Sequence, residues 1–222
     1  MPAYTKLRAR KNACAHDRLT SMDGLRERKK VVTRKALGEA ALRLALEHGP
    51  DNVRVDDIAE AAGVSPRTYN NYFSSREQAI VAAITAERAL RLAAALRARP
   101  ATEPLAEAVT EAVVEQYASE PTGDALTMIT STPRLRTEFI NAISTIRQPL
   151  ASAIADRIGD DTLAPEVLAA AVSAAARVAV EQWVRPHGDN GFVVVTMRKP
   201  LGDLLREALA HVAPALQAAE HS

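Results

Sequence analysis

Cysteine is almost absent from this chain of 222 residues, and aromatic residues make up only 4% of it. The one cysteine, Cys14, cannot form an internal disulfide, which fits a reducing compartment. No window approaches about 18 uninterrupted apolar residues, so the sequence predicts no transmembrane helix. Residues 1–20 lack the apolar centre of a secretory signal. We therefore expect a cytoplasmic protein that does not enter a membrane.

The motifs of common enzymes are also missing. The sequence contains no Gly-x-Ser-x-Gly elbow, no His-Glu-x-x-His and no glycine run that would cradle a phosphate. The histidines are scattered, and none has a second ligand type at metal-binding spacing: His16, His48, His187, His211 and His221. We expect no catalysis, no cofactor and no metal site, and an enzyme is the weaker alternative.

The residues that are abundant favour helices. Apolar residues make up 47% of the chain and come largely from alanine and leucine. These two are the strongest helix formers, whereas strands prefer β-branched and aromatic residues. The composition therefore predicts an all-α fold.

Charge is distributed unevenly along the chain. Residues 1–35 contain eleven Lys or Arg against three acids, a net charge of +8, so the other 187 residues carry −7 of the total +1. A basic arm on an acidic body is typical of a protein that meets a polyanion at one end. A solvated tail explains the same charges equally well. Residues 1–24 are predicted to be a flexible basic tail, and Met22 is an alternative translation start.

Helical periodicity begins after this tail. A first helix is predicted from Thr33, and Gly49-Pro50 ends it because proline cannot continue a helix. The basic residues just before Thr33 are then expected to reach phosphates or a minor groove: Arg26, Arg28, Lys29 and Lys30. A short helix, Val55–Ala62, follows and closes at Gly63. Ser65-Pro66 opens the next helix, because serine caps an N-terminus and proline suits the first helical position.

More helices are predicted along the remainder of the chain. A capping box of Ser74 and Glu77 opens a long helix that runs past Arg97 to Pro100. Further helices are expected at Leu105–Ser119, Ala125–Ser131, Leu135–Ile158 with a bend near Pro149, Pro165–Val184 and Pro200–Gln217. Residues 186–191 are rich in turn formers, and Phe192–Val195 is interpreted as an irregular lead-in to the last helix.

The segment IAEAAGVSPRTYNNYF, residues 58–73, contains two short helices around a tight glycine turn. Its second helix has an apolar side of Tyr69, Tyr72 and Phe73. The opposite side carries a polar stripe of Arg67, Asn70, Asn71 and Ser74. Arginine can pair with guanine and asparagine with adenine in the major groove, so the segment predicts a helix-turn-helix that binds DNA.

Residues 25–85 resemble the N-terminal domain of the TetR family of bacterial regulators. The matching features are Thr33-Arg34, Ala40-Ala41, Gly49, Ile58-Ala59, Ala62-Gly63-Val64-Ser65, Thr68, Tyr72-Phe73 and Ser75-Arg76-Glu77. The resemblance implies a three-helix DNA-binding head followed by a helical body that dimerises and binds a small molecule. It implies DNA contacts from Thr33, Arg54, Ser65, Pro66, Arg67, Thr68, Asn70, Asn71, Tyr72 and Arg76. Among these, Thr68, Tyr72 and Arg76 would touch phosphates, and Arg67, Asn70 and Asn71 would face bases.

The sequence departs from the family pattern at several positions. Ala45 and Pro50 stand where the family often has aromatic residues. Arg54 replaces a threonine that often caps the second helix, so we expect a different cap there. Asn70 stands where many members have a phosphate-contacting tyrosine, which leaves its partner open between backbone and base.

The domain boundaries expected from these observations are a tail at 1–24, a DNA-binding domain at 25–77 and a ligand-binding and dimerisation body at 78–222. The resemblance implies that the small residues of 168–180, together with Pro200–Gln217, form a four-helix seam in a homodimer. The candidate pocket residues are Tyr117, Met128, Phe139, Arg147, Arg177 and Trp183. For the aromatic ones a plain core role is an alternative, and for Arg177 an ion pair with Glu181 is favoured.

The expected partners are double-stranded DNA, in a palindromic operator, and an unknown, mostly apolar effector. A repressor that leaves its operator when the effector binds is the default interpretation. The alternative is a ligand-independent DNA-binding or architectural protein with the same head.

Overall fold

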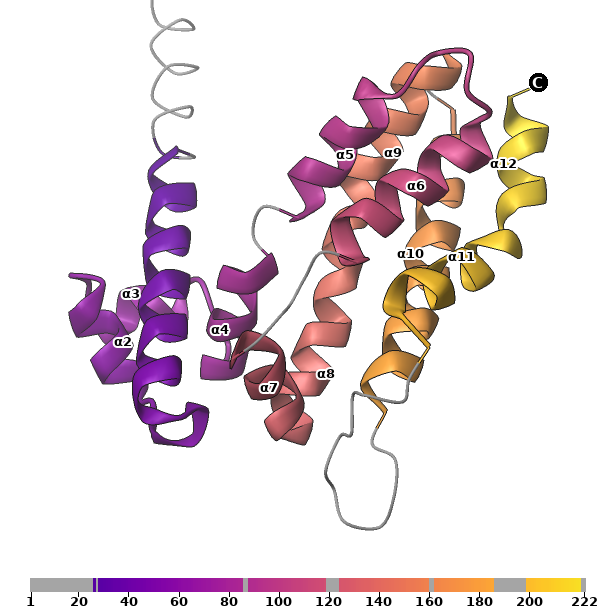
Figure 1. Cartoon of the computed structure of the whole chain (residues 1–222). Coiled ribbons are helices and arrows are strands. Elements are labelled where there is room, and N and C mark those ends of the chain that lie inside the picture. The colour runs from indigo at the N-terminus through magenta and orange to yellow at the C-terminus, as the bar shows by residue number, and fades with distance from the viewer. Residues whose placement is uncertain are drawn as a thin grey trace, which may run out of the picture.

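The computed structural model describes residues 26, 28–85, 88–118, 124–159, 162–185 and 199–220. Every regular element among these residues is a helix, as the composition predicts. Figure 1 shows a small group of helices from the first third of the chain at one end, and a larger helical body beside it. The predicted tail at 1–24 and the loop at 186–191 lie outside the described residues, as does Phe192–Val195.

The head begins with a helix at residues 28–48, followed by the 3₁₀ turn η1 (Pro50–Asn52) and the short helices α2 (Val55–Ala61) and α3 (Pro66–Asn70). The first helix starts before Thr33, so Arg28, Lys29 and Lys30 lie on the helix and do not precede it. It ends at Gly49, whose φ of 82° favours glycine. The Asn52 side chain donates a 2.7 Å hydrogen bond to the carbonyl of His48 and so caps this end.

The body contains nine further helices within the described residues. They are α4 (Arg76–Thr85), α5 (Arg88–Ala98), α6 (Leu105–Ala118), α7 (Asp124–Ser131), α8 (Pro133–Asn141), α9 (Arg147–Ile158), α10 (Ala164–Val184), α11 (Leu201–Ala210) and α12 (Ala213–Ala219), with the 3₁₀ helix η2 (Ala142–Ile146) between α8 and α9. The helix α10 packs on α9 and α11, and α5 packs on α9 and α6. The helix α4 contacts α8 and η2, so it joins the head to the body.

Two predicted helices prove to be divided. For a third, the long helix from Ser74, the structure describes α4 and α5, and the two residues between them, 86–87, lie outside the described part. The break in 135–158 falls at η2, where the hydroxyls of Ser144 and Thr145 each donate a 2.7 Å hydrogen bond to the backbone carbonyl three residues earlier.

Pro149 therefore causes no bend. It lies in the first turn of α9, where its missing N–H would have no helical partner in any case. The last predicted helix ends at Ala210 and restarts at Ala213, because Pro214 in the first turn of α12 cannot donate the hydrogen bond that a continuous helix needs.

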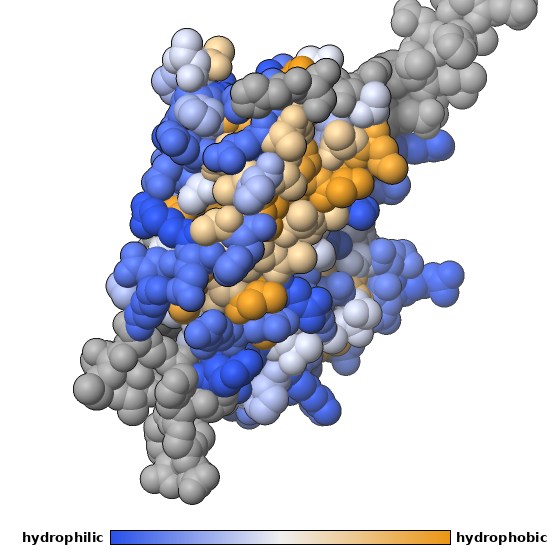
Figure 2. Space-filling model, turned by 90° about the vertical axis from the view of Figure 1, so that its right-hand side faces the viewer, coloured by the Kyte–Doolittle hydropathy of each residue, from blue (hydrophilic) through white to orange (hydrophobic). Residues whose placement is uncertain are grey.

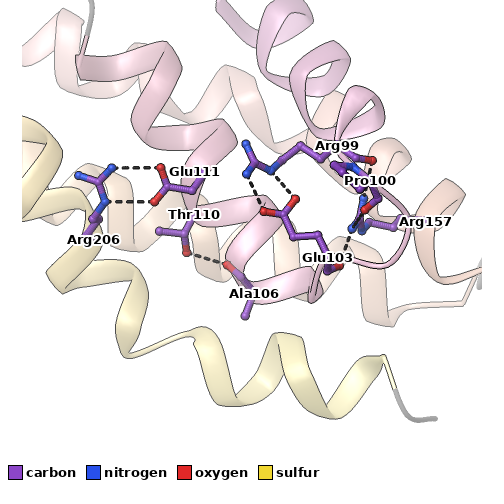
Figure 3. Close-up of polar contacts among 8 residues, drawn as sticks. All are labelled: Arg99, Pro100, Glu103, Ala106, Thr110, Glu111, Arg157 and Arg206. Atoms are coloured by element: carbon purple, nitrogen blue, oxygen red, sulfur yellow. Dashed lines mark hydrogen bonds and ion pairs between the residues drawn. The ribbon is translucent and has the colours of Figure 1, made fainter.

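Polar side chains tie the body helices together at one corner, which Figure 3 shows. Arg157 of α9 donates to the carbonyls of Arg99, Pro100 and Glu103, at 3.3, 2.7 and 2.6 Å, and so satisfies the C-terminal end of α5 and the following turn. Arg206 of α11 makes a two-pronged ion pair with Glu111 of α6, at 3.1 and 3.0 Å. This pairing lowers the pKa of Glu111.

The helix α10 is long and apolar enough to cross a membrane by length and composition. In the structure 44% of its most apolar window is buried, and its neighbours are α9 and α11. The apolar composition of α10 is therefore explained by its packing against these two helices of the body.

Candidate functional site

The turn between α2 and α3 sets the direction of α3. Gly63 has a φ of 67°, a conformation that side chains disfavour. The N–H of Val64 donates to the carbonyl of Ala59 at 2.9 Å and closes the turn. The Ser65 hydroxyl then accepts from the N–H of Thr68 at 3.1 Å, and Pro66 occupies the first turn of α3. The sequence-based prediction of this turn and cap is confirmed.

One side of α3 is anchored in the head. Tyr69 and Phe73 are buried, with ring centroids 5.8 Å apart. The Tyr69 hydroxyl donates a 2.8 Å hydrogen bond to the carbonyl of Ser75 just before α4. Burial raises the pKa of Tyr69 to about 12, with a smaller contribution from Glu77, so the hydroxyl keeps its proton at neutral pH. The predicted core side of the helix is thus held to the start of α4.

The other side of α3 faces solvent. The side chains of Arg67, Asn70, Asn71 and Ser74 are all exposed. Within the described part of the chain, the first three have no intramolecular hydrogen bond to their side chains. The predicted polar stripe is therefore present, and its guanidinium and carboxamide groups are available to an external partner.

A groove separates this stripe from the first helix. It has a volume of about 490 Å³ and is lined by Lys30, Val31, Arg34, Thr68, Asn71 and Tyr72. Arg34 donates a 2.8 Å hydrogen bond to the carbonyl of Tyr72, and its guanidinium lies 4.5 Å from the centre of the Phe73 ring. The groove thus combines cations from one helix with polar side chains from another, which suits a phosphate backbone. Thr33 lies half-buried on the same helix.

Sequence reasoning did not include Arg34 among the DNA contacts, and it expected Lys30 to reach phosphates from a position before the first helix. Both residues fall one helical turn apart on the first helix, at a spacing that places them on one face. That spacing is the signal that would have identified them.

Arg76 holds the head together. Its guanidinium donates to the carbonyls of Asp51 and Val53, at 2.8 and 3.1 Å, and to the carboxylate of Glu77 at 3.1 Å. These contacts favour a structural role over the phosphate contact implied by the family resemblance.

At the predicted cap of α2, Arg54 is exposed, and its backbone N–H donates to the Asp57 carboxylate at 3.3 Å. Asp57 therefore supplies the capping contact that the sequence left open. The structure also corrects the N-terminus of α4. Ser75 is the cap, since its hydroxyl accepts from the N–H of Gln78 at 3.0 Å, while the Gln78 side chain accepts from the N–H of Ser74 at 2.8 Å.

The candidate pocket residues divide into buried and exposed sets. Tyr117, Met128 and Phe139 are buried in the body, and Trp183 is half-buried. Arg147 and Arg177 are exposed, so the structure does not place them with the buried set. Arg177 instead pairs with Glu181 at 2.7 Å, one helical turn along α10, as the spacing predicts. Arg147 is the first residue of α9 and is not among the buried residues of that helix.

Sequence reasoning missed a buried cation among these residues. Arg88 is buried, and its guanidinium carbon lies 4.6 Å from the centre of the Tyr117 ring and 5.5 Å from that of Phe139. Arg88 precedes Leu92 and Leu96 by one and two helical turns, and both leucines are buried. This spacing places Arg88 on the apolar face of α5, and it is the signal that would have revealed it. Among the described residues, no group of three or more His, Cys, Asp or Glu is arranged to hold a metal ion.

Comparisons with known proteins agree with this arrangement. Residues 37–83 match the family model of bacterial regulatory proteins of the tetR family, and residues 103–217 match the model of the MftR C-terminal domain. The HTH-type transcriptional regulator TcmR of Streptomyces glaucescens is 33% identical over 202 residues, which cover 84% of this chain and 89% of that protein. The HTH-type transcriptional regulator BetI of Rhizobium meliloti (strain 1021) is 47% identical over 53 residues, which cover 24% of this chain and 26% of that protein.

A solved structure that the chain matches in part is that of FadR of Thermus thermophilus, a TetR-family transcriptional repressor in complex with lauroyl-CoA. It is 20% identical, with a TM-score of 0.48, and the match covers 81% of this chain and 92% of that one. The relatives with the higher identities are transcription regulators and not enzymes. From the two family models and the relative that matches over most of its length, the chain belongs to the TetR family of DNA-binding transcription regulators.

Proposed function

We propose that this protein is a cytoplasmic repressor that binds a palindromic operator as a homodimer and leaves it when a small, mostly apolar effector binds. The observation that carries the DNA-binding part is the exposed stripe of Arg67, Asn70 and Asn71 beside the groove with Lys30 and Arg34. The stripe offers groups that read base edges, and the groove offers cations that hold the phosphate backbone.

The dimer is proposed from the surface of the body. Figure 2 shows a broad apolar area on the side of the molecule where α10, α11 and α12 lie in Figure 1. On α10, Val167 and Val178 are 55% and 59% exposed, and their spacing of three helical turns places them on one face. An apolar helix face of this kind is typical of an interface between subunits. A two-fold dimer would present two heads about 34–36 Å apart to successive half-sites.

The proposed effector response requires a contact between body and head. The helix α4 packs on α8 and η2. A depression of about 380 Å³ lies at this contact, lined by Ser75, Glu77, Pro133, Arg134, Thr137 and Glu138. An effector bound among the body helices would shift α8 against α4 and so change the position of the head. It can release the operator only to the extent that it binds the two arrangements with different affinity.

The test of DNA binding is a triple substitution, R67A/N70A/N71A, measured against genomic fragments selected by the unmodified protein. Each two-pronged base contact contributes about 1–3 kcal/mol, so we expect the operator affinity to fall by at least about 100-fold. The matched control is N141A/R147A/Q148A, which removes one arginine and two amides from exposed positions of the body. Unchanged operator affinity in the first variant would refute the proposed recognition surface.

The effector response is tested by titration calorimetry with and without operator. A compound that releases the protein from its operator must bind the protein–operator complex more weakly than it binds the free protein. Equal affinities for every compound that binds would leave the ligand-independent DNA-binding protein as the remaining interpretation.

A further inference from the structure

The members of the exposed stripe on α3 have different neighbours. Asn71 lines the groove of about 490 Å³ between α3 and the first helix, whereas Arg67 and Asn70 do not line it. The hydroxyl of Ser74 donates to the Gln78 side chain at 3.2 Å. The stripe therefore divides into one asparagine in the groove, a pair of residues outside it, and a serine that already has a partner.

The helical period explains this division. Asn70 is the last residue of α3, and Asn71 follows it with helical backbone angles. Successive residues of a helix are rotated by about 100°, so Asn71 lies about 40° to one side of Arg67 and Asn70 about 60° to the other. Since the side of Asn71 faces the first helix, the side of Asn70 faces away from it.

The surroundings of Asn71 suit a phosphate. The same groove is lined by Arg34, whose guanidinium donates to the Tyr72 carbonyl at 2.8 Å and lies 4.5 Å from the centre of the Phe73 ring. A cation held in place beside a carboxamide donor can bind phosphate oxygens, a contact that carries no base preference. The groove thus favours a backbone contact for Asn71, where the family resemblance implies a base contact.

Arg67 and Asn70 are placed differently. Both are exposed, and their side chains have no intramolecular hydrogen bond within the described residues. A guanidinium can donate to O6 and N7 of guanine, and a carboxamide can accept from N6 and donate to N7 of adenine. Three residues of helix rise about 4.5 Å and one base step about 3.4 Å, so the two side chains would reach base pairs that are adjacent or separated by one pair.

We propose that Arg67 reads a guanine and Asn70 an adenine in each half-site of the operator, on base pairs that are adjacent or separated by one pair, while Asn71 binds the phosphate backbone. The proposal rests on the operator binding given above. It adds which side chains of the stripe determine the sequence and which two bases they select.

The test uses operator duplexes from the genomic fragments that the unmodified full-length protein selects. One purine at a time is replaced in both half-sites by its 7-deaza analogue, which lacks the N7 acceptor that each proposed base contact uses. Affinity is measured by fluorescence anisotropy. We expect the unmodified protein to lose about tenfold or more in affinity at one guanine and at one adenine, because each substitution removes a hydrogen bond from both half-sites.

The variants R67A and N70A assign these two bases. R67A should bind the guanine analogue and the natural duplex equally well and remain sensitive to the adenine analogue, since the contact that the first analogue removes is already missing. N70A should show the reverse pattern. A side chain that only kept the head in shape would weaken binding to every duplex equally, so the pattern separates base recognition from a structural role.

N71A is the matched comparison, because it removes the same side chain one position along the chain. It should weaken binding to all duplexes by one common factor, at least about threefold, and keep both sensitivities. The control N141A removes an exposed asparagine of the body and should change neither the affinity nor the sensitivities.

The proposal is overturned if R67A or N70A keeps both sensitivities, if N71A loses one, or if the two sensitive base pairs are separated by more than one pair. An unmodified protein that binds its operator but is sensitive to neither analogue also refutes this assignment and leaves DNA binding intact. A protein that selects no genomic fragment refutes the proposed function itself.

Discussion

The head and the body of this molecule are held together in different ways. In the head, short-range hydrogen bonds cap or anchor the elements: Ser65 caps α3, Tyr69 reaches Ser75, and Asn52 caps the first helix. The longer-range hydrogen bonds of the head come from Arg34 and Arg76. In the body, the determining contacts join distant segments, as when Arg157 satisfies the end of α5 and Arg206 reaches α6. Local contacts of the first kind leave a recognisable sequence pattern, whereas contacts of the second kind depend on how whole helices pack.

The largest effect expected from a change in the body is on the dimer. V167E/V178E would place two charges on the proposed apolar interface, where each buried charge costs several kcal/mol. We expect a monomer in analytical ultracentrifugation and at least about 100-fold weaker operator binding, since the two half-sites are no longer bound together. A variant that remains dimeric would locate the interface elsewhere on the body.

A second prediction uses two glycines with the same backbone geometry. Gly63 in the head and Gly159 in the body both have a φ of 67°, and an added Cβ would meet no atom within 4 Å at either. G63A and G159A should therefore each lower the free energy of unfolding by about 1–2 kcal/mol. Only G63A should also weaken operator binding, by about tenfold, because Gly63 sets the direction of α3, whose contacts are worth about 1–3 kcal/mol each. An equal loss of operator affinity in G159A would contradict this distinction between head and body.

A third prediction concerns the hydrogen bond behind α3. Y69F removes only the hydroxyl that donates to the carbonyl of Ser75. We expect a loss of about 1 kcal/mol in the free energy of unfolding, measured by urea denaturation. Y72F is the matched control, since Tyr72 is half-buried in the groove and has no such bond in the described residues. Equal stability of Y69F and the unmodified protein would show that this bond does not hold α3 in place.

The smallest effect is expected from the ion pair between Glu111 and Arg206. Its groups are partly exposed, so E111Q should lower the free energy of unfolding at pH 7 by only a few tenths of a kcal/mol. The pairing lowers the pKa of Glu111, so its stabilisation is present above the pKa of the unfolded chain. It is lost as the pH falls through the lower pKa of the folded state, and the difference between variant and unmodified protein should then disappear. A difference that grows toward low pH would contradict the assigned pairing.

These contrasts account for what the sequence alone could predict. The turn at Gly63, the cap at Ser65 and the polar stripe from Arg67 were predictable because each depends on residues only a few positions apart. The start of the first helix was misplaced because Arg28, Lys29 and Lys30 are polar, and the two valines that follow them are exposed and do not extend the buried apolar face. The element type was correct throughout the described body, while helix ends were less predictable.

Buried charge was the hardest feature to predict. Arg88 stands among alanine and leucine with nothing nearby in the sequence to show that two aromatic rings, from α6 and α8, would enclose it. Arg177 also stands among small apolar residues, alanine and valine, but lies on the surface. Only the packing of distant helices separates the two cases.

The guanidinium of Arg76 has a mechanical consequence for regulation. It joins the first residue of α4 to the backbone at positions 51 and 53, immediately before α2. We therefore expect a displacement of α4 to move α2 and its neighbour α3 with it. The exposed polar stripe of α3 would then change its position relative to DNA even when α4 shifts by too little to break any hydrogen bond inside the head.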